Sequence, residues 1–214
     1  MSFINEIEYY VYDEYIELGK EAYHEKIHYF EAHQLHILNL PLNQSIELQC
    51  DYIEALHQTN RYFKVLNKVD DLIGAIIYEN VYHIKGTDVY KSMLFIKADS
   101  LYNTIDYKKA NHVISELIKI DGNNSLCKTL FVKNNVDNLR YEGQKVHAVG
   151  ILLFLTSAFV IGTEILMIRS FYNEWIDIFV AIRNILFLCG VVLIVGQEIN
   201  IRMKSLKAYN QLIK

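Results

Sequence analysis

Hydrophobic and polar positions along this chain follow two different patterns. From residue 3 to residue 145, apolar side chains recur with a heptad-like spacing among Tyr, His, Lys and Glu. This spacing places apolar residues on one face of a helix and polar residues on the other. From Val146 onward, charged residues become rare. The first part is therefore predicted to be a water-facing helical domain, and the second part to be helices without a polar face.

The helical pattern of the first part is interrupted at three places. Each interruption contains the Pro, Gly, Asn or Asp residues that favour turns, at residues 40–43, 85–88 and 121–124. The segments between them are about 40 residues long, and each has room for two helices. The single proline, Pro41, also favours helices over a turn-rich β fold. We therefore expect an all-α domain of stacked helical hairpins.

One of these hairpins carries a motif. Residues 91–124 place apolar or small residues on facing sides of two helices. The residues that carry the motif are Leu94, Ala98, Leu101, Tyr107, Ala110, Ile114 and Leu117. This unit resembles a tetratricopeptide repeat, although Leu94 stands where that family has a large aromatic residue and Gly122 where it has a proline. Residues 46–79 and 13–43 match the repeat more loosely.

The resemblance implies a superhelical stack with a concave groove that binds a peptide or a partner protein. Three hairpins are about the minimum for a continuous core in such a stack. The helix expected at residues 125–145 would then cap the open end of the stack. A generic helical bundle is the alternative fold for residues 1–124.

Two segments of the second part are long and apolar enough to cross a bilayer. They cover residues 146–168 and 176–195, and at roughly 1.5 Å per residue each spans about the thickness of a hydrocarbon core. Because the connection is short, the two helices are expected to be antiparallel neighbours. Tyr172 and Trp175 fit the aromatic belt at a membrane surface. A pair of buried core helices is the alternative, but core helices of this length normally keep a polar face.

Basic residues flank the two apolar segments unequally. Five lie close to the outer ends of the pair: Arg140, Lys145, Arg202, Lys204 and Lys207. The connection holds only Arg169. By the positive-inside rule, both termini are expected to be cytoplasmic, on the inner face of a plasma or inner membrane. The acidic first residues, which lack the pattern of a signal peptide, and three widely spaced cysteines agree with a reducing compartment.

Two ionisable residues fall inside the apolar segments. Glu164 and Arg183 lie at similar distances from the connection, so an antiparallel hairpin brings them to a similar depth. Charges at membrane depth are costly and usually face a partner or a water-filled cavity. Three interpretations stay open: an internal ion pair that holds the hairpin together, side chains that extend toward the nearby membrane surface, or a polar seam between several copies that lines a pore. Small residues that allow close helix packing are Gly150, Ser157, Ala158, Gly162, Gly190 and Gly196.

The sequence offers little for catalysis or cofactor binding. The formal net charge is −4, so no nucleic-acid partner is expected. The chain has no Gly-rich phosphate loop and no Gly-x-Ser-x-Gly motif, so we expect neither an enzyme nor a cofactor. His24 and His28 have a four-residue helical spacing, but no His-Glu-x-x-His arrangement accompanies them, and no metal site is expected.

The chain is thus predicted to contain a helical domain (1–124), a capping helix (125–145), a transmembrane hairpin (146–199) and a basic cytosolic tail (200–214). This organisation fits two functions. In the first, the protein is a membrane-anchored adaptor that binds a protein or peptide partner in the cytosol. In the second, it is an oligomeric effector whose helical domain senses a signal and whose hairpins form a pore or disrupt the bilayer, as in bacterial defence or toxin systems. The repeat resemblance favours the adaptor, whereas the charges inside the apolar segments favour the effector.

Overall fold

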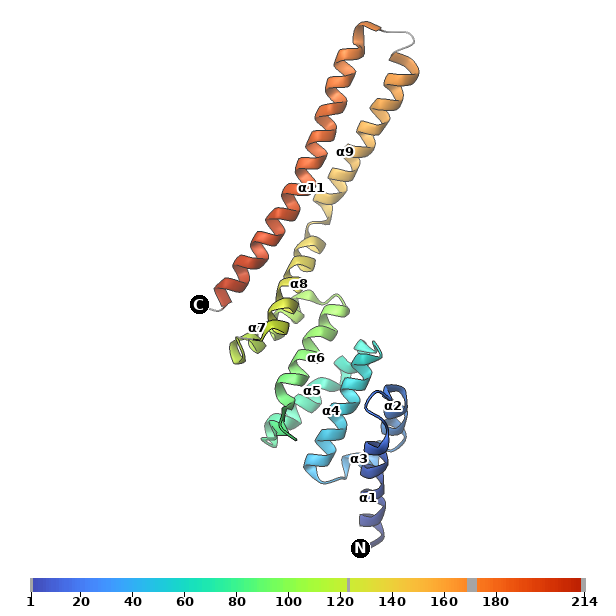
Figure 1. The fold of residues 1–214 in the computed structure, drawn as a ribbon, viewed down its shortest axis with the longest axis vertical. Coiled ribbons are helices and arrows are strands. Elements are labelled where there is room, and N and C mark those ends of the chain that lie inside the picture. The colour runs from blue at the N-terminus through green and yellow to red at the C-terminus, as the bar shows by residue number, and fades with distance from the viewer. Residues whose placement is uncertain (1, 123, 169–172, 213–214) are drawn as a thin grey trace. The chain divides into compact units, whose positions relative to one another are not determined.

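The structure is a computed structural model that describes residues 2–122, 124–168 and 173–212. It is 85% helical and contains ten α-helices and one short β-hairpin in the described residues. The predicted all-α class with two long apolar helices near the C-terminus is confirmed (Figure 1). The chain forms two compact units, Met1–Asn134 and Asn135–Lys214. The division falls inside helix α8 (Ser125–Glu142).

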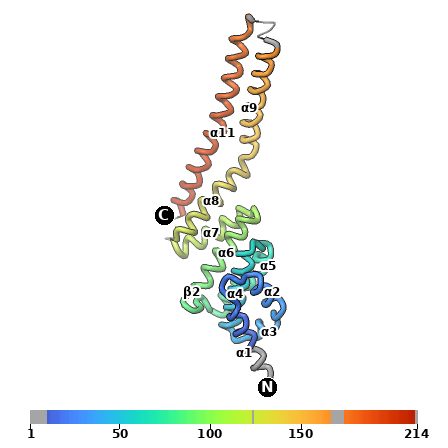
Figure 2. The backbone as a smooth tube through the Cα atoms, turned by 45° about the vertical axis from the view of Figure 1, so that its right-hand side comes forward, coloured from blue at the N-terminus to red at the C-terminus, as the bar shows by residue number. Residues whose placement is uncertain are grey.

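The N-terminal unit consists of helices α1 to α7, a β-hairpin and the first part of α8. The helices are α1 (Ser2–Glu17), α2 (Tyr23–Ala32), α3 (Gln34–Leu38), α4 (Leu42–Gln58), α5 (Tyr62–Tyr78), α6 (Val89–Asn103) and α7 (Tyr107–Ile120). Each helix from α4 to α7 packs against the next, and α4 also contacts α6 (Figures 1 and 2). Helix α2 packs on α4, and α1 contacts α2, α3 and α4. The result is a stack of helical hairpins.

The core of this stack is formed by the apolar faces that the heptad-like spacing creates. The side chains with the lowest exposure include Leu56, Val65, Val69, Ile76, Ala98 and Ile114. Burial of one large aliphatic side chain contributes about 1.5–3 kcal/mol relative to exposure. The periodic apolar positions therefore account for both the helices and their association.

Helices α4 and α6 end in turns of the same geometry. Their C-cap residues are Thr59 and Thr104, and each hydroxyl donates to carbonyls three and four residues earlier, at 2.9–3.1 Å. The next residues, Asn60 and Ile105, have left-handed backbone, with φ of 58° and 66°. The following amide bonds to the carbonyl five residues before it, which completes a Schellman motif. The hairpins α4–α5 and α6–α7 therefore share one turn design.

A β-hairpin lies between α5 and α6, where the sequence predicted only a turn. Strand β1 (His83–Ile84) pairs with antiparallel strand β2 (Thr87–Asp88). The turn residues Lys85 and Gly86 both have positive φ, at 49° and 83°, as a type I′ turn requires. Asp88 then starts α6, because its carboxylate accepts the amide hydrogen of Lys91 at 3.0 Å.

The C-terminal unit is an antiparallel pair of long helices. Helix α9 (Gln144–Thr163) continues into a π-helix, η1 (Glu164–Ile168). A 3₁₀ turn, η2 (Asn173–Trp175), precedes α11 (Ile176–Leu212). Helices α9 and α11 lie side by side in both views (Figures 1 and 2). Helix α11 continues without a break through the segment expected to be the basic tail, so this tail is helical as far as Leu212.

Ile105 is the residue in this fold whose backbone conformation fits its side chain least. A β-branched residue at positive φ costs about 1–3 kcal/mol, and the Ile105 side chain is largely exposed, so packing does not repay this cost. We expect Ile105→Asn, which matches Asn80 at the end of α5 (φ 57°), to raise the free energy of unfolding by about 1 kcal/mol. Thermal unfolding of the full chain, followed by circular dichroism, measures this change.

The reverse substitution is the matched control. Asn80→Ile creates the same strain at an exposed position, and it is expected to lower the melting temperature by a similar amount. A lower melting temperature for Ile105→Asn than for the parent chain would contradict this account.

Candidate functional site

The paired helices α9 and α11 present an apolar outer surface. Gln144–Leu166 (23 residues) and Ile176–Leu212 (37 residues) are both long and apolar enough to cross a membrane. Only 17% and 6% of their most apolar windows are buried by the rest of the described chain. A soluble core helix would be mostly buried, so the alternative of two buried core helices does not fit. Apolar surface of this extent marks a membrane or a protein partner.

Two glycines let the helices cross closely. A Cβ atom added to Gly150 would lie 2.6 Å from Ile194 Cγ1, and one added to Gly190 would lie 3.1 Å from Phe154 Cε1. By contrast, a Cβ at Gly162 or at Gly196 would meet no atom within 4 Å. The predicted small residues therefore divide into those that form the helix crossing and those that face outward.

The two ionisable residues of the apolar segments meet inside the pair. Arg183 Nη1 donates to Glu164 Oε2 at 3.0 Å, and the Glu164 side chain is 1% exposed. Ser157 Oγ donates to the Arg183 carbonyl at 3.3 Å. The π-helix starts at Glu164 itself, and such widened turns frequently occur at functional sites. Polar groups from both helices are thus satisfied within one copy of the chain.

A second polar contact, which the sequence did not predict, joins the other end of the pair. Arg140 Nη2 donates to Glu198 Oε1 at 2.5 Å, and Glu198 also accepts from Arg202 at 3.0 Å. Nearby, Gln197 Nε2 donates to the Gly143 carbonyl at 3.0 Å. The sequence does contain a signal for this contact, because an arginine and a glutamate, which carry opposite charges, lie just beyond the outer ends of the two apolar segments.

The residues of the tetratricopeptide-like motif belong to the core and not to an open surface. Six of them are buried: Leu94, Ala98, Leu101, Ala110, Ile114 and Leu117. Tyr107 is half-buried, and its carbonyl accepts from the Asn134 side-chain amide at 2.9 Å. These residues shape the stack, and Leu101 also contributes to the groove described next. Of the aromatic belt residues, Trp175 is 54% exposed, and Tyr172 lies outside the described residues.

A groove of about 720 Å³ lies between α5, α6 and α7 and is a candidate surface for a partner. Its apolar lining includes Leu66, Leu101 and Val113, together with Phe63, which is 76% exposed. Its charged lining contains two ion pairs, Lys97–Asp70 at 2.6 Å and Lys109–Asp106 at 2.7 Å. Lys109 also holds the pKa of the Asp106 carboxyl below its usual value. Thr104, Lys108 and His112 also line the groove, so its lining contains three lysines and two aspartates.

Candidate chemistry elsewhere in the described chain is sparse. No group of three His, Cys, Asp or Glu side chains lies close enough to hold a metal ion among these residues. His24 and His28 are exposed on α2. All three cysteines are free, with Cys50 and Cys127 buried and Cys189 exposed.

No family model, no curated protein and no solved structure matches this chain. The tetratricopeptide resemblance therefore rests on the motif residues and on the arrangement of the hairpins.

The glycine crossing predicts a sharp difference between two similar substitutions. Gly150→Val forces side-chain atoms into Ile194 and is expected to destabilise the helix pair by about 1–3 kcal/mol. Gly162→Val, in the same helix but facing open space, is the matched control and should change little. Unfolding in SDS, followed by the fluorescence of the single tryptophan, Trp175, measures both. Equal losses for the two variants would show that the crossing is not as described.

The ion pair predicts strong coupling between its two members. Glu164→Leu leaves the Arg183 guanidinium without its carboxylate partner and is expected to cost about 3 kcal/mol. The double variant Glu164→Leu/Arg183→Leu removes both charges and should regain most of this loss. The same SDS titration, read as a double-mutant cycle, gives the coupling energy. Losses that simply add would mean that the two side chains do not interact.

Proposed function

We propose that this protein is a membrane-anchored adaptor. Helices α9 and α11 cross the bilayer as an antiparallel hairpin, and the N-terminal helical stack binds a protein or peptide partner in the cytosol. The observation that carries the proposal is the closed polar interior of the helix pair beneath an exposed apolar surface. Such a pair is suited to lipid and needs no second copy to neutralise its charges.

The ion pair between Glu164 and Arg183 within one chain favours an anchor over a pore. A pore would use Glu164 and Arg183 to line a polar channel between copies. Here the Glu164 carboxylate is buried against Arg183 of the same chain, and Ser157 bonds to the backbone of the facing helix. These contacts pair the two charges of the apolar segments within one chain, and most side chains on the outer surface of the pair are apolar.

The distribution of basic residues supports a cytosolic position for both ends of the hairpin. Arg140 and Lys145 precede α9 or lie in its first turn, and Arg202, Lys204 and Lys207 lie in the last part of α11. Positive charge of this kind is retained on the cytoplasmic side. The helical stack would then face the cytosol, where an adaptor meets its partners.

The groove between α5, α6 and α7 suits a partner segment that combines apolar or aromatic side chains with acidic ones. Phe63 offers an exposed aromatic anchor beside an apolar lining, and aromatic residues are enriched among binding hot spots. The excess of basic side chains in the lining favours acidic residues in that segment. The tetratricopeptide resemblance agrees with this peptide-binding role.

An oligomeric membrane effector is the second candidate, because Gly162 and Gly196 face outward with nothing packed on them. Outward small residues let a second hairpin approach closely. The double variant Glu164→Leu/Arg183→Leu separates the two functions. An adaptor keeps its partner and its membrane location in this variant, whereas an effector loses its activity on the bilayer.

A photo-crosslinker placed in the groove tests the adaptor function. With p-benzoylphenylalanine at position 63, irradiated cells are expected to yield a discrete crosslinked species in the membrane fraction, because a bound segment would cover Phe63. Tyr78 on the same helix is also highly exposed but does not line the groove, so the same crosslinker at position 78 is the matched control. No crosslink at position 63, or an identical pattern at both positions, would contradict a partner in this groove.

A further inference from the structure

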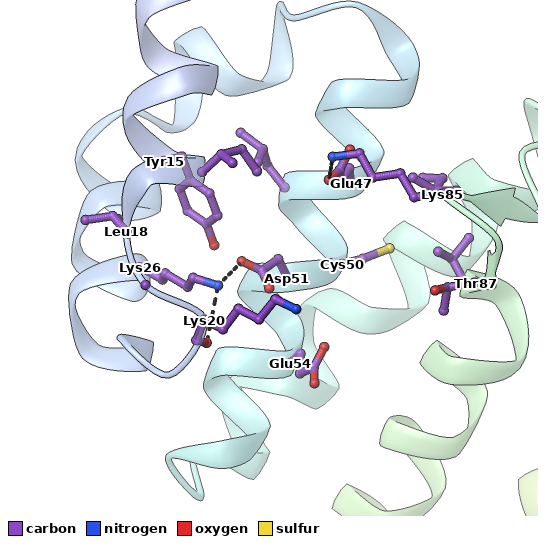
Figure 3. A pocket seen from close by; sticks show the side chains of 15 residues that line it. Tyr15, Leu18, Lys20, Lys26, Glu47, Cys50, Asp51, Glu54, Lys85 and Thr87 are labelled. Atoms are coloured by element: carbon purple, nitrogen blue, oxygen red, sulfur yellow. Dashed lines mark hydrogen bonds and ion pairs between the residues drawn. The ribbon is translucent and has the colours of Figure 1, made fainter.

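A second cavity of the N-terminal unit has the chemistry of a small-molecule site. It measures about 520 Å³ and lies among the end of α1, the start of α2, the middle of α4 and the β-hairpin (Figure 3). Ligand pockets usually measure about 300–1,000 Å³. Four separate segments of the chain converge here, so the cavity depends on the fold and not on one local motif.

A nearly buried ion pair forms one wall of the cavity. Lys26 Nζ lies 2.8 Å from Asp51 Oδ2 and 3.5 Å from the Lys20 carbonyl, and the Lys26 side chain is 8% exposed. Lysine is rarely buried, and the cost of its desolvation is offset here by the carboxylate. The Lys26 ammonium has three hydrogens and two protein acceptors, so it keeps a donor for a further group.

The Tyr15 hydroxyl lies beside this ion pair, close to the Asp51 carboxylate. Its side chain is fully buried, and its oxygen has no well-formed hydrogen bond to any described residue. Figure 3 shows the hydroxyl pointing toward Lys26 and Asp51. Burial, followed by the nearby Asp51 charge, raises the pKa of the phenol, so it stays protonated as a donor. An unsatisfied buried hydroxyl is costly, and a bound acceptor would remove this cost.

Two further charges line the cavity without ion-pair partners among the described residues. Lys20 follows α1, and Glu54 lies on α4 (Figure 3). The Lys85 ammonium, by contrast, is ion-paired, because it donates to Glu47 at 2.6 Å and to the Tyr12 hydroxyl at 3.1 Å. The cavity is therefore neutral overall and offers one free cation and one free anion in addition to the Tyr15 donor.

The rest of the lining is apolar and unreactive. Its aliphatic lining residues include Ile84 and Val89, with Leu48 buried behind them. Cys50 also lines the cavity, but burial raises the pKa of its thiol to about 12, so it remains a neutral thiol near pH 7. The chemistry of the cavity is that of binding and not of nucleophilic catalysis.

We propose that this cavity binds a small zwitterion with an apolar side chain, such as a free apolar amino acid or a dipeptide. The ligand carboxylate accepts from the Tyr15 hydroxyl, Lys26 and Lys20. Its ammonium group lies toward Glu54 and the outer oxygen of Asp51, and its apolar group packs on Ile84 and Val89. This site is separate from the groove between α5, α6 and α7, and the inference goes beyond the adaptor function without depending on it.

Ligand-induced stabilisation of the full chain in nanodiscs is the test. The probes are L-leucine, L-methionine, L-phenylalanine and the dipeptide leucyl-leucine, with N-acetyl-L-leucine and L-leucinamide as analogues that each lack one charge. At a hundredfold excess over its dissociation constant, a fitting zwitterion is expected to raise the melting temperature by about 5 °C. The two analogues should give much smaller shifts. No shift with any zwitterion, or an equal shift with both analogues, would overturn the proposal.

The variant Tyr15→Phe separates a ligand site from a purely structural cavity. Without ligand, it should melt at the same temperature as the parent or higher, because an unsatisfied hydroxyl is removed. With ligand, its shift should fall to less than half of the parental value. Tyr10→Phe, an exposed tyrosine of the same helix, is the matched control. A full ligand shift in Tyr15→Phe would place the ligand elsewhere and overturn the assignment.

Glu54→Gln tests the cationic end of the ligand in the same way. It should reduce affinity for L-leucine about tenfold and leave any weak binding of N-acetyl-L-leucine unchanged, while Glu79→Gln, also exposed, is the control. An unchanged affinity for L-leucine would overturn the zwitterion assignment. Crosslinking from position 63 reads out the adaptor function independently, so failure of one proposal is distinguishable from failure of the other.

Discussion

The outward apolar surface of α9 and α11 is the constraint on which the organisation of this protein depends. Neither helix buries this surface within the described chain, and water is a poor solvent for it. Any polar group within the pair must therefore be satisfied between the two helices. The Glu164–Arg183 ion pair, the Ser157 hydroxyl and the glycine crossing meet this requirement together. The contact of Arg140 with Glu198 then closes the pair where charged residues return to the sequence.

The N-terminal unit is constrained differently, because the apolar face of each of its helices must be kept out of water. Repeated hairpins with matching Schellman turns achieve this by stacking. The stack leaves two recesses of different chemistry. The groove between α5, α6 and α7 is open and basic and suits a chain segment, whereas the cavity beside Tyr15 is lined by balanced charges and suits a small molecule. A membrane adaptor with a ligand cavity would connect a small metabolite to the recruitment of a partner.

The sequence predicted those features that depend on periodicity and length. The length of the two apolar segments predicted the two long helices. Their short connection predicted the antiparallel pairing that brings Glu164 opposite Arg183. The turn-forming residues at 40–43 and 121–124 also separate helices in the structure. The β-hairpin was not predicted, because Lys85 at positive φ leaves no compositional signal. The cavity beside Tyr15 could not be predicted either, since residues far apart in the sequence form it and only tertiary packing brings Lys20, Lys26 and Glu54 together.

Cysteine accessibility across a sealed membrane tests the central claim most directly. On a background in which Cys50, Cys127 and Cys189 are replaced by alanine, Glu174→Cys reports on the connected end of the hairpin and Gln211→Cys on the last turn of α11. The account predicts that a membrane-impermeant maleimide labels only position 174 in right-side-out vesicles and only position 211 in inside-out vesicles. Labelling of both positions from the same side would contradict a hairpin that crosses the bilayer.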